Sequence, residues 1–290
     1  MEYEGQICRA PMERASYMLP VAVGCSYNAC KFCTLFKHLR YRELPMEQIE
    51  AELQRVKQAG GAPKKVFLGD GSAFSLSADR LLECIGLVHR YFPMCSTIHM
   101  DATISDIAAK SDRELRMLRE AGVKCLYLGI ESGLDDVLRF MNKDHTLAEA
   151  YRQIARIRGF GYDYAAHIMT GIAGKGRGME NAEAMAVFFN RTKPVSICNF
   201  SLFLHSKAPL YREIQTGTFR AADEVENMRE ERRLLELLET DGLSYDGFHD
   251  MIEFRVRGQL PRDRERMLEK LDGAIARWEE KDPAYAFVDW

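Results

Sequence analysis

The stretch that decides the fold is Gly24-Cys25-Ser26-Tyr27-Asn28-Ala29-Cys30-Lys31-Phe32-Cys33-Thr34, which follows a short apolar run. Its three cysteines are separated by four and two residues, so a short loop can bring their thiolates around one metal centre. An iron–sulfur cube needs four ligands, and with three from this loop one iron would stay open to another molecule. The same thiols with His38 could instead form a closed zinc site that braces the loop. A pure electron carrier is disfavoured because carriers normally supply four cysteines.

The remaining cysteines are scattered one to a segment, and we interpret them as small buried apolar side chains. They are Cys8, Cys84, Cys95, Cys125 and Cys198. Free thiols in this number fit a reducing compartment. The N-terminus is acidic, unlike a secretory signal, and no run approaches the roughly 20 apolar residues of a membrane span. We therefore expect a cytoplasmic protein without membrane contact.

The charge balance argues against a polyanion as the partner. Forty Lys and Arg stand against 43 Asp and Glu in 290 residues, a formal net charge of −3, so nucleic-acid binding is not expected. A basic run beside the cysteines could recognise the carboxylates or phosphate of a small-molecule substrate, although such runs are more commonly solvated. It comprises Lys31, Lys37, Arg40 and Arg42.

Between about residues 18 and 205, β-rich runs alternate six times with helical patterns. Strands are predicted over residues 19–24, 65–69, 95–100, 123–130, 162–170 and 195–204. Helices are predicted over residues 46–59, 77–92, 111–121, 134–141, 147–158 and 179–191. The alternation indicates parallel strands joined by crossover helices. Six units are too few for a closed eight-fold barrel, so we predict an α/β fold, a partial (β/α)6 TIM-like barrel with its site at the carboxyl ends of the strands.

The pattern changes after residue 205 to turn residues and two charged helices, over residues 223–240 and 262–279, with a possible strand at 251–256. We assign residues 1–205 to the barrel core and residues 206–290 to a helical C-terminal extension packed on it. The sequence has no internal repeat or long linker, which favours one continuous unit.

The cysteine loop resembles that of the radical S-adenosylmethionine (SAM) superfamily, whose barrel carries three cysteines after its first strand. The gap of four residues between the first two cysteines, where three is usual, is found in a smaller branch of Elp3-like proteins and relatives of oxygen-independent coproporphyrinogen oxidase. The resemblance implies that Cys25, Cys30 and Cys33 hold a 4Fe–4S cluster. It also places Phe32 at the aromatic position beside the adenine of SAM.

The resemblance extends over roughly residues 18–275. Phe67-Leu68-Gly69-Asp70-Gly71 is similar to the glycine-rich end of the second strand, which contacts the methionyl amino group. It implies cofactor contacts from Gly69, Asp70 and Gly71, although the family commonly has a glutamate where Gly71 stands. Gly258-Gln259-Leu260-Pro261 with residues 264–268 resembles the C-terminal segment of the branch.

Two later motifs resemble the walls of the SAM site. Leu128-Gly129-Ile130-Glu131-Ser132-Gly133, followed by Met141-Asn142-Lys143, is similar to the fourth-strand signature. Tyr127 and Glu131 share a strand face with Gly129 between them, so the glycine leaves space while Glu131 offers acceptors for ribose hydroxyls. Ser132 belongs to the same wall. His167-Ile168-Met169-Thr170-Gly171 resembles the fifth-strand signature whose backbone approaches adenine, which places His167 and Thr170 in the cofactor site.

The resemblance implies a radical SAM enzyme, an oxidoreductase of an anoxic cytosol. Its members cleave SAM reductively with an electron from flavodoxin or ferredoxin, and the 5′-deoxyadenosyl radical abstracts hydrogen from a substrate. With no cobalamin-binding domain before the barrel and no basic RNA-binding domain after it, cobalamin-dependent methylation and tRNA modification are not expected. The alternative is a non-catalytic zinc or iron–sulfur binding protein.

No residue of the chain is assigned a proton-transfer role. Several polar residues on predicted strands are interpreted as hydrogen-bonded groups of the core. They are His99, His167, Asn199, Ser201 and His205.

Overall fold

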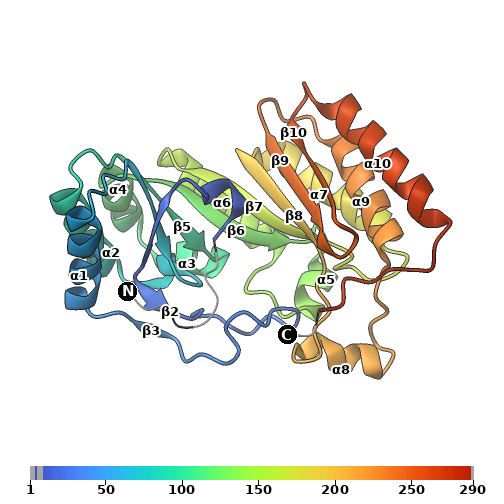
Figure 1. Ribbon diagram of the computed structural model, residues 1–290, viewed down its shortest axis with the longest axis horizontal. Coiled ribbons are helices and arrows are strands. Elements are labelled where there is room, and N and C mark those ends of the chain that lie inside the picture. Colours follow the sequence, from blue (N-terminus) through green and yellow to red (C-terminus); the bar gives the residue numbers. More distant parts are fainter. Residues whose placement is uncertain (1–3, 5–8, 289–290) are drawn as a thin grey trace. The chain divides into compact units, whose positions relative to one another are not determined.

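The computed structural model describes Glu4 and residues 9–288, in which strands and helices alternate along the chain (Figure 1). The strands of the main sheet are β1 (Tyr17–Pro20), β4 (Lys65–Gly69), β5 (Thr97–Ala102), β6 (Val123–Glu131), β7 (Asp163–Thr170), β8 (Ser196–Ser201), β9 (Ser244–His249) and β10 (Phe254–Gln259). Their order is β1-β4-β5-β6-β7-β8-β9-β10. The described pairings are parallel except that of β9 with β10. The predicted α/β class with a mostly parallel sheet is confirmed.

Helices connect most of these strands, as crossover connections require. They are α1 (Met46–Gln58), α2 (Ala78–Tyr91), α3 (Ile104–Ala109), α4 (Asp112–Glu120), α5 (Asp135–Phe140), α6 (Leu147–Gly159), α7 (Gly178–Thr192), α8 (Pro209–Gln215), α9 (Glu224–Leu237) and α10 (Arg264–Glu279). Two short strands, β2 (Ala22–Val23) and β3 (Arg42–Glu43), pair separately. In the described part of the chain, no helix is both long and apolar enough to cross a membrane.

The chain forms two compact units, and each is described by itself. The first unit consists of residues 1–28, 35–128 and 152–164. The second unit consists of residues 29–34, 129–151 and 165–290. The predicted division into residues 1–205 and 206–290 stays a prediction.

In the first unit, apolar faces of β1, β4 and β5 form the core beneath α1 and α2, which lie side by side (Figure 1). Local capping sets where the helices begin. Ser77 accepts a hydrogen bond from the backbone N–H of Arg80 at the start of α2, and Ser111 with Glu114 forms a capping box at the start of α4. The predicted capping-box start at Ser111 is thereby confirmed.

Glu13 anchors the N-terminal segment to the sheet of the first unit. Its carboxylate is fully buried and accepts hydrogen bonds from Lys65 Nζ at 2.8 Å and from the Tyr127 hydroxyl at 2.5 Å. His99 Nδ1 lies 2.8 Å from the same oxygen. Burial alone would raise the pKa of Glu13, but these partners hold it well below its usual range. His99 therefore has the hydrogen-bonded core position predicted for it.

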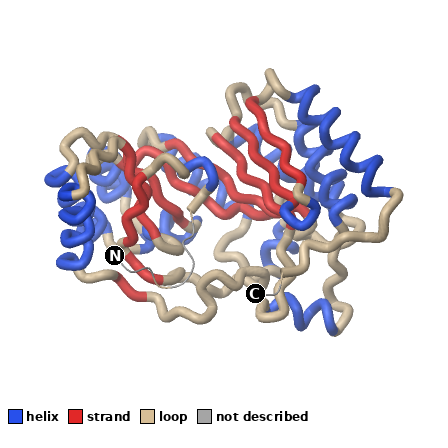
Figure 2. Tube along the Cα trace, viewed as in Figure 1, coloured by secondary structure: helices blue, strands red, loops and turns tan. Residues whose placement is uncertain are grey.

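In the second unit, α7, α9 and α10 pack beside β8, β9 and β10 (Figures 1 and 2). A buried polar cluster joins α9 to the sheet. His249 Nδ1 lies 2.7 Å from Glu224, and His249 Nε2 lies 3.0 Å from Glu231. Ser201 donates to Glu224 at 2.7 Å, and Asn199 donates to Glu231 at 3.0 Å. Asn199 and Ser201 are thus hydrogen-bonded core groups, as predicted.

The structure differs from the predicted elements at several ends. The first predicted strand is divided, because β1 ends at Pro20, which has no N–H to donate, and β2 then pairs with β3. The C-terminal extension is not only helical, since β9 and β10 lengthen the sheet. β9 reads Ser-Tyr-Asp-Gly-Phe-His, which lacks the β-branched residues that signal a strand. The short helices α3 and α8 were also not predicted.

Candidate functional site

In the first unit, the end of β4 packs directly against the start of the cysteine loop. Gly71 has a φ of +51°, and a Cβ placed on it would lie 2.1 Å from the carbonyl oxygen of Gly24 and 2.9 Å from the Cα of Cys25. Gly71 therefore allows a backbone approach that a side chain would prevent, and the glutamate common in the family cannot stand here without moving the loop. Asp70 is buried, and its Oδ1 accepts the N–H of Gly71 at 2.9 Å.

Cys25 lies in the first unit within a loop that Asn28 organises. The side-chain amide of Asn28 donates to the carbonyl of Phe36 at 2.8 Å, and its backbone N–H lies 3.5 Å from the sulfur of Cys25. Cys25 is partly exposed. A backbone N–H directed at sulfur stabilises a thiolate, the form in which cysteine binds a metal.

In the second unit, Cys30 and Cys33 flank a short turn that is tied to α5 and α8. The backbone N–H of Lys31 donates to the carbonyl of Met141 at 2.9 Å, and the carbonyl of Lys31 accepts from Leu210 at 2.9 Å. Both cysteines are partly exposed. Burial raises the pKa of Cys30 to about 11, an effect that nearby Lys143 opposes.

Phe32 is buried at the centre of this turn. It belongs to an apolar cluster with Met141, with Leu210 and with two residues that follow β7, Ile172 and Ala173. The structure therefore brings the predicted adenine-side aromatic residue and the loop after β7 into one cluster. Aromatic and aliphatic side chains in such a cluster suit the faces of a planar ring.

Glu131 ends β6 in a left-handed conformation, with φ of 62°, which is uncommon for a residue with a side chain. Its carboxylate turns back over Gly129, where an added Cβ would lie 2.4 Å from Glu131 Oε1 and 3.1 Å from Lys143 Nζ. Glu131 Oε1 is 3.6 Å from Lys143 Nζ. The space above Gly129 is thus taken by the Glu131 carboxylate itself, with the Lys143 ammonium beside it.

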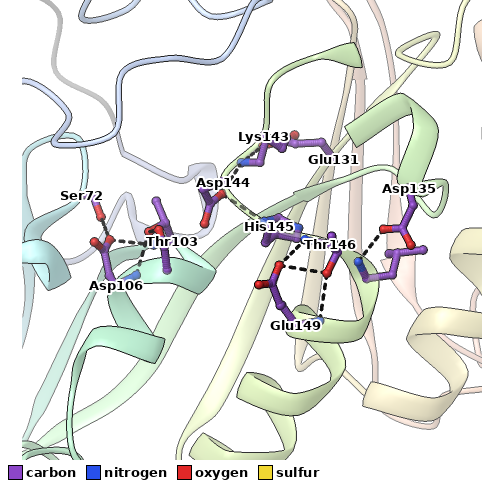
Figure 3. Close-up of polar contacts among 12 residues, drawn as sticks. Ser72, Thr103, Asp106, Glu131, Asp135, Lys143, Asp144, His145, Thr146 and Glu149 are labelled. Carbon is purple, nitrogen blue, oxygen red and sulfur yellow. Dashed lines mark hydrogen bonds and ion pairs between the residues drawn. The ribbon is translucent and has the colours of Figure 1, made fainter. Parts of the chain in front are cut away.

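Figure 3 shows how this pair continues to Asp144 and His145 in the second unit. Lys143 Nζ is also 3.6 Å from Asp144 Oδ1, and Asp144 is 3.0 Å from His145 Nδ1. All four side chains are at most 9% exposed. Burial raises the pKa of Glu131, and Lys143 acts in the opposite direction.

The remaining predicted residues of the second unit are Ser132, directly after β6, and His167 and Thr170, on β7. Ser132 and Thr170 are fully buried, and the N–H of Thr170 donates to Asn199 at 3.1 Å. His167 is partly exposed, and desolvation with nearby Lys143 lowers its pKa to about 4. His167 therefore carries a neutral imidazole at neutral pH.

Asn142 and Lys143 have roles that the sequence analysis did not assign. Asn142 Nδ2 donates to the carbonyl of Ala29 at 3.0 Å, which ties the residue before Cys30 to the end of α5. Lys143 places a cation near both Glu131 and Cys30. Both residues stand in the signature Met141-Asn142-Lys143. The signature marks them as part of the site, but only the folded structure shows which residues they contact.

The predicted site residues divide between the two units. Gly69, Asp70, Gly71 and Cys25 belong to the first unit, and the other predicted site residues belong to the second. Within the described residues, no three His, Cys, Asp or Glu side chains are gathered closely enough to hold a metal ion. The cysteine ligands and SAM contacts therefore stay predictions.

Two groups of the second unit have the chemistry that SAM and an iron–sulfur cluster require. Glu131 Oε2 is buried and has no hydrogen-bond partner among the described residues. A buried carboxylate oxygen without a donor is costly, and a ligand hydroxyl would satisfy it. The neighbouring Cys30 thiol has a raised pKa, so it ionises only beside a positive charge. A bound metal ion would supply that charge.

Among the described cysteines, those outside the loop are buried, as predicted. They are Cys84, Cys95, Cys125 and Cys198. Cys8 lies outside the described residues. Burial raises the pKa of Cys84 to about 11, so this thiol stays protonated and behaves as an apolar side chain.

The basic run near the cysteine loop is largely engaged. Lys31 pairs with Glu213 at 2.8 Å, and Arg42 pairs with Glu4. Lys37 donates to the carbonyl of Asn28. These contacts favour the interpretation of a solvated, structural run over that of a substrate-binding patch.

Comparisons with known proteins bear directly on this site. Residues 19–186 match the family model described as the radical SAM superfamily. The chain is 24% identical over 198 residues to the heme chaperone HemW of Bacillus subtilis (strain 168), which covers 66% of this chain and 51% of that protein. It is 24% identical over 235 residues to a tRNA-2-methylthio-N(6)-dimethylallyladenosine synthase of Chlorobium phaeobacteroides (strain BS1), covering 78% and 49%. The chain thus spans about half the length of these curated relatives.

Two solved structures share its fold. The Elp3 of the archaeon Methanocaldococcus infernus, with an N-terminal deletion, is similar with a TM-score of 0.56 and 13% identity, over 80% of this chain and 56% of that one. Methylornithine synthase (PylB) is similar with a TM-score of 0.56 and 16% identity, over 91% and 85%. These likenesses confirm the partial-barrel fold, and the sequence match to HemW supports the predicted branch. The chain belongs to the radical SAM superfamily of enzymes, whose members bind a 4Fe–4S cluster and SAM and cleave SAM reductively.

Proposed function

We propose that this protein is a radical SAM enzyme that abstracts hydrogen from a small-molecule substrate. Cys25, Cys30 and Cys33 would hold the cluster. When bound, the cluster and SAM supply reductive cleavage to methionine and a 5′-deoxyadenosyl radical. The SAM contacts would come from Phe32, Gly69, Asp70, Gly71, Glu131, Ser132, His167 and Thr170.

The observation that carries this proposal is the buried carboxylate of Glu131. Its Oε1 lies over Gly129 and faces the cation of Lys143, and its Oε2 has no hydrogen-bond partner among the described residues. A pair of ribose hydroxyls would donate to such a carboxylate, since its Oε2 has no donor among the described residues. Phe32 and the loop after β7 would supply the apolar contact for adenine.

The chain's own residues would bind and orient SAM and shield the radical from water. The neutral imidazole of His167 adds no charge to the site. The surrounding apolar cluster would exclude water from a reactive radical. We propose a flavodoxin or ferredoxin as electron donor, because reductive cleavage of SAM needs an electron from outside the chain. We propose the anoxic cytosol as the compartment, because the described cysteines are free thiols and an exposed cluster is oxidised by oxygen.

The test is anaerobic reconstitution with iron and sulfide, followed by dithionite and SAM without substrate. We expect a brown protein that slowly forms 5′-deoxyadenosine and methionine in equal amounts, measured by liquid chromatography with mass detection. A protein that carries a full, reducible cluster and binds SAM, yet forms no 5′-deoxyadenosine, would overturn the proposal. A colourless protein that holds zinc would support the binding-protein alternative.

Two thiol variants serve as matched controls. Cys30→Ala removes a thiol of the turn, and Cys84→Ala removes a buried thiol of α2. We expect the first to lose iron and SAM cleavage, because two thiolates cannot hold the cube, and the second to keep both. The reverse result would show that the ligand assignment is wrong.

A further inference from the structure

A chain of buried hydrogen bonds connects the loops that follow β6 and β7 in the second unit. Asn181, on α7, accepts from Ser132 Oγ at 2.6 Å and from the N–H of Gly133 at 3.0 Å through its Oδ1. Its Nδ2 donates to Glu230 Oε1, on α9, at 2.7 Å. The other oxygen of Glu230 accepts the N–H of Gly171 at 2.8 Å. One amide and one carboxylate thus link the two loops.

The three side chains that form this series of hydrogen bonds are shielded from solvent. Ser132 and Asn181 are fully buried, and Glu230 is 1% exposed. Every oxygen of Asn181 and Glu230 accepts at least one hydrogen bond. Two donors meet Asn181 Oδ1, which fixes the orientation of its amide and directs Nδ2 at Glu230. A buried network in which each member is satisfied holds its partners in one arrangement.

Both loops approach these helices too closely for alternative packing. A Cβ added to Gly133 would lie 2.5 Å from the backbone nitrogen of Met185 on α7. A Cβ added to Gly171 would lie 2.4 Å from Asn227 Oδ1 on α9, and Gly171 has a φ of +81°. The glycines therefore seat each loop against a helix, and Asn181 with Glu230 determines how far apart the two loops stand.

We propose that Asn181 and Glu230 are positioning residues that hold the loops after β6 and β7 at the spacing that SAM requires. The inference rests on the proposed function, because four of the predicted cofactor residues lie on these two strands or directly after them. Glu131 and Ser132 stand at the end of β6, and His167 and Thr170 stand on β7. Site walls that are already held in position bind a ligand without an entropic cost of ordering them.

A reversal of hydrogen-bond polarity provides the test. Glu230→Gln places an amide NH2 against either the Asn181 amide or the Gly171 N–H, so a donor meets a donor. Asn181→Asp places a second carboxylate against Glu230. The double variant Asn181→Asp with Glu230→Gln restores every bond, because the introduced amide donates to the introduced carboxylate and still accepts from Gly171. The formal net charge of the double variant equals that of the wild type.

The matched control is Asn190→Ala, a change of the same residue type on the same helix. Asn190 also joins α7 to the end of α9, donating to the carbonyl of Leu237 at 2.9 Å and accepting from the N–H of Glu239 at 2.8 Å. It contacts neither cofactor loop through these bonds. A loss caused only by weaker packing of α7 on α9 should therefore affect Asn190→Ala as well.

Two readouts are needed, the SAM dissociation constant of the reconstituted protein by calorimetry and amide hydrogen exchange of the chain before reconstitution. We expect each single variant to weaken SAM binding about tenfold, and the double variant to return to within about twofold of wild type. Hydrogen exchange should become faster in the peptide that contains Gly133 and in the peptide that contains Gly171. We expect this in the single variants and not in the double variant. Asn190→Ala should leave the SAM dissociation constant unchanged.

The outcomes separate this inference from the proposed function. If the wild type binds SAM and the single variants bind it equally well, the bridge is not a positioning device, although the proposed function stands. If the double variant binds SAM as weakly as the single variants, the hydrogen-bond polarity assigned to Asn181 and Glu230 is wrong. If the reconstituted wild type does not bind SAM, the proposed function and the cofactor role of the bridge both fail, whatever the exchange rates show.

Discussion

Gly71→Ala is the change by which the contact between β4 and the cysteine loop can be measured. The new methyl group would stand 2.1 Å from the Gly24 carbonyl oxygen and 2.9 Å from the Cα of Cys25. Both neighbours are backbone atoms, which cannot turn away as a side chain can. The loop before the first predicted ligand must therefore shift.

Gly60→Ala is the matched control. Gly60 has a φ of +81°, and a Cβ added to it would meet no atom within 4 Å. A left-handed residue with a side chain costs about 1–2 kcal/mol, and this cost is shared by both variants. Overpacking against backbone adds about 1–3 kcal/mol, and only Gly71→Ala has this further cost. The gain from a less flexible unfolded chain is common to both and cancels.

Chemical denaturation of the two variants before reconstitution measures the difference in free energy of unfolding, and iron per chain after reconstitution measures the effect on the loop. We expect Gly71→Ala to be less stable than Gly60→Ala by about 1–3 kcal/mol and to retain less iron. Equal losses of stability with full iron content in both would refute the reasoning, because the close backbone approach would then be without consequence.

Three further predictions concern buried polar groups. Glu131→Ala should weaken SAM binding about tenfold or more in calorimetry, since charge-assisted hydrogen bonds are lost. The iron content of the cluster should stay normal. An unchanged SAM dissociation constant would show that Glu131 is not part of the site. Lys110→Met should lower the free energy of unfolding by about 2 kcal/mol, because Lys110 Nζ donates to the carbonyls of Phe74 and Leu76 at 2.8 Å each. Urea denaturation measures this, and a variant as stable as the wild type would contradict it. Burial would lower the pKa of His249, but its two carboxylate neighbours raise it from 6.5 to about 9, so its contribution to stability is complete below pH 6.5 and is lost as the pH rises through 9. His249→Gln should flatten that decline in denaturation curves measured between pH 6.5 and 9.5, and a decline of the same slope in the variant would assign it to other groups.

Much of the fold follows from signals that lie within a few residues of each other. The capping box of Ser111 and Glu114 spans one helical turn, and the structure has it where the sequence predicts it. The cysteine loop and the glycine-rich end of β4 are likewise continuous stretches, so their residues could be named without a structure. β9 was missed because its stability comes from pairing with β8 and β10 and not from its own composition.

The candidate site depends on contacts between residues that are distant in sequence. The sequence identified Gly129, Glu131 and Lys143 as parts of one signature, but only the folded chain directs the Glu131 carboxylate over Gly129 and leaves its Oε2 without a donor. Asn181 and Glu230 are separated by 48 intervening residues, and nothing in either neighbourhood marks them as partners. Local sequence determines conformation through hydrogen bonds and sterics over three or four residues. The pairing of a particular amide with a particular carboxylate is decided by the packing of α7 on α9, because only tertiary contact removes water from both and makes the bond between them necessary.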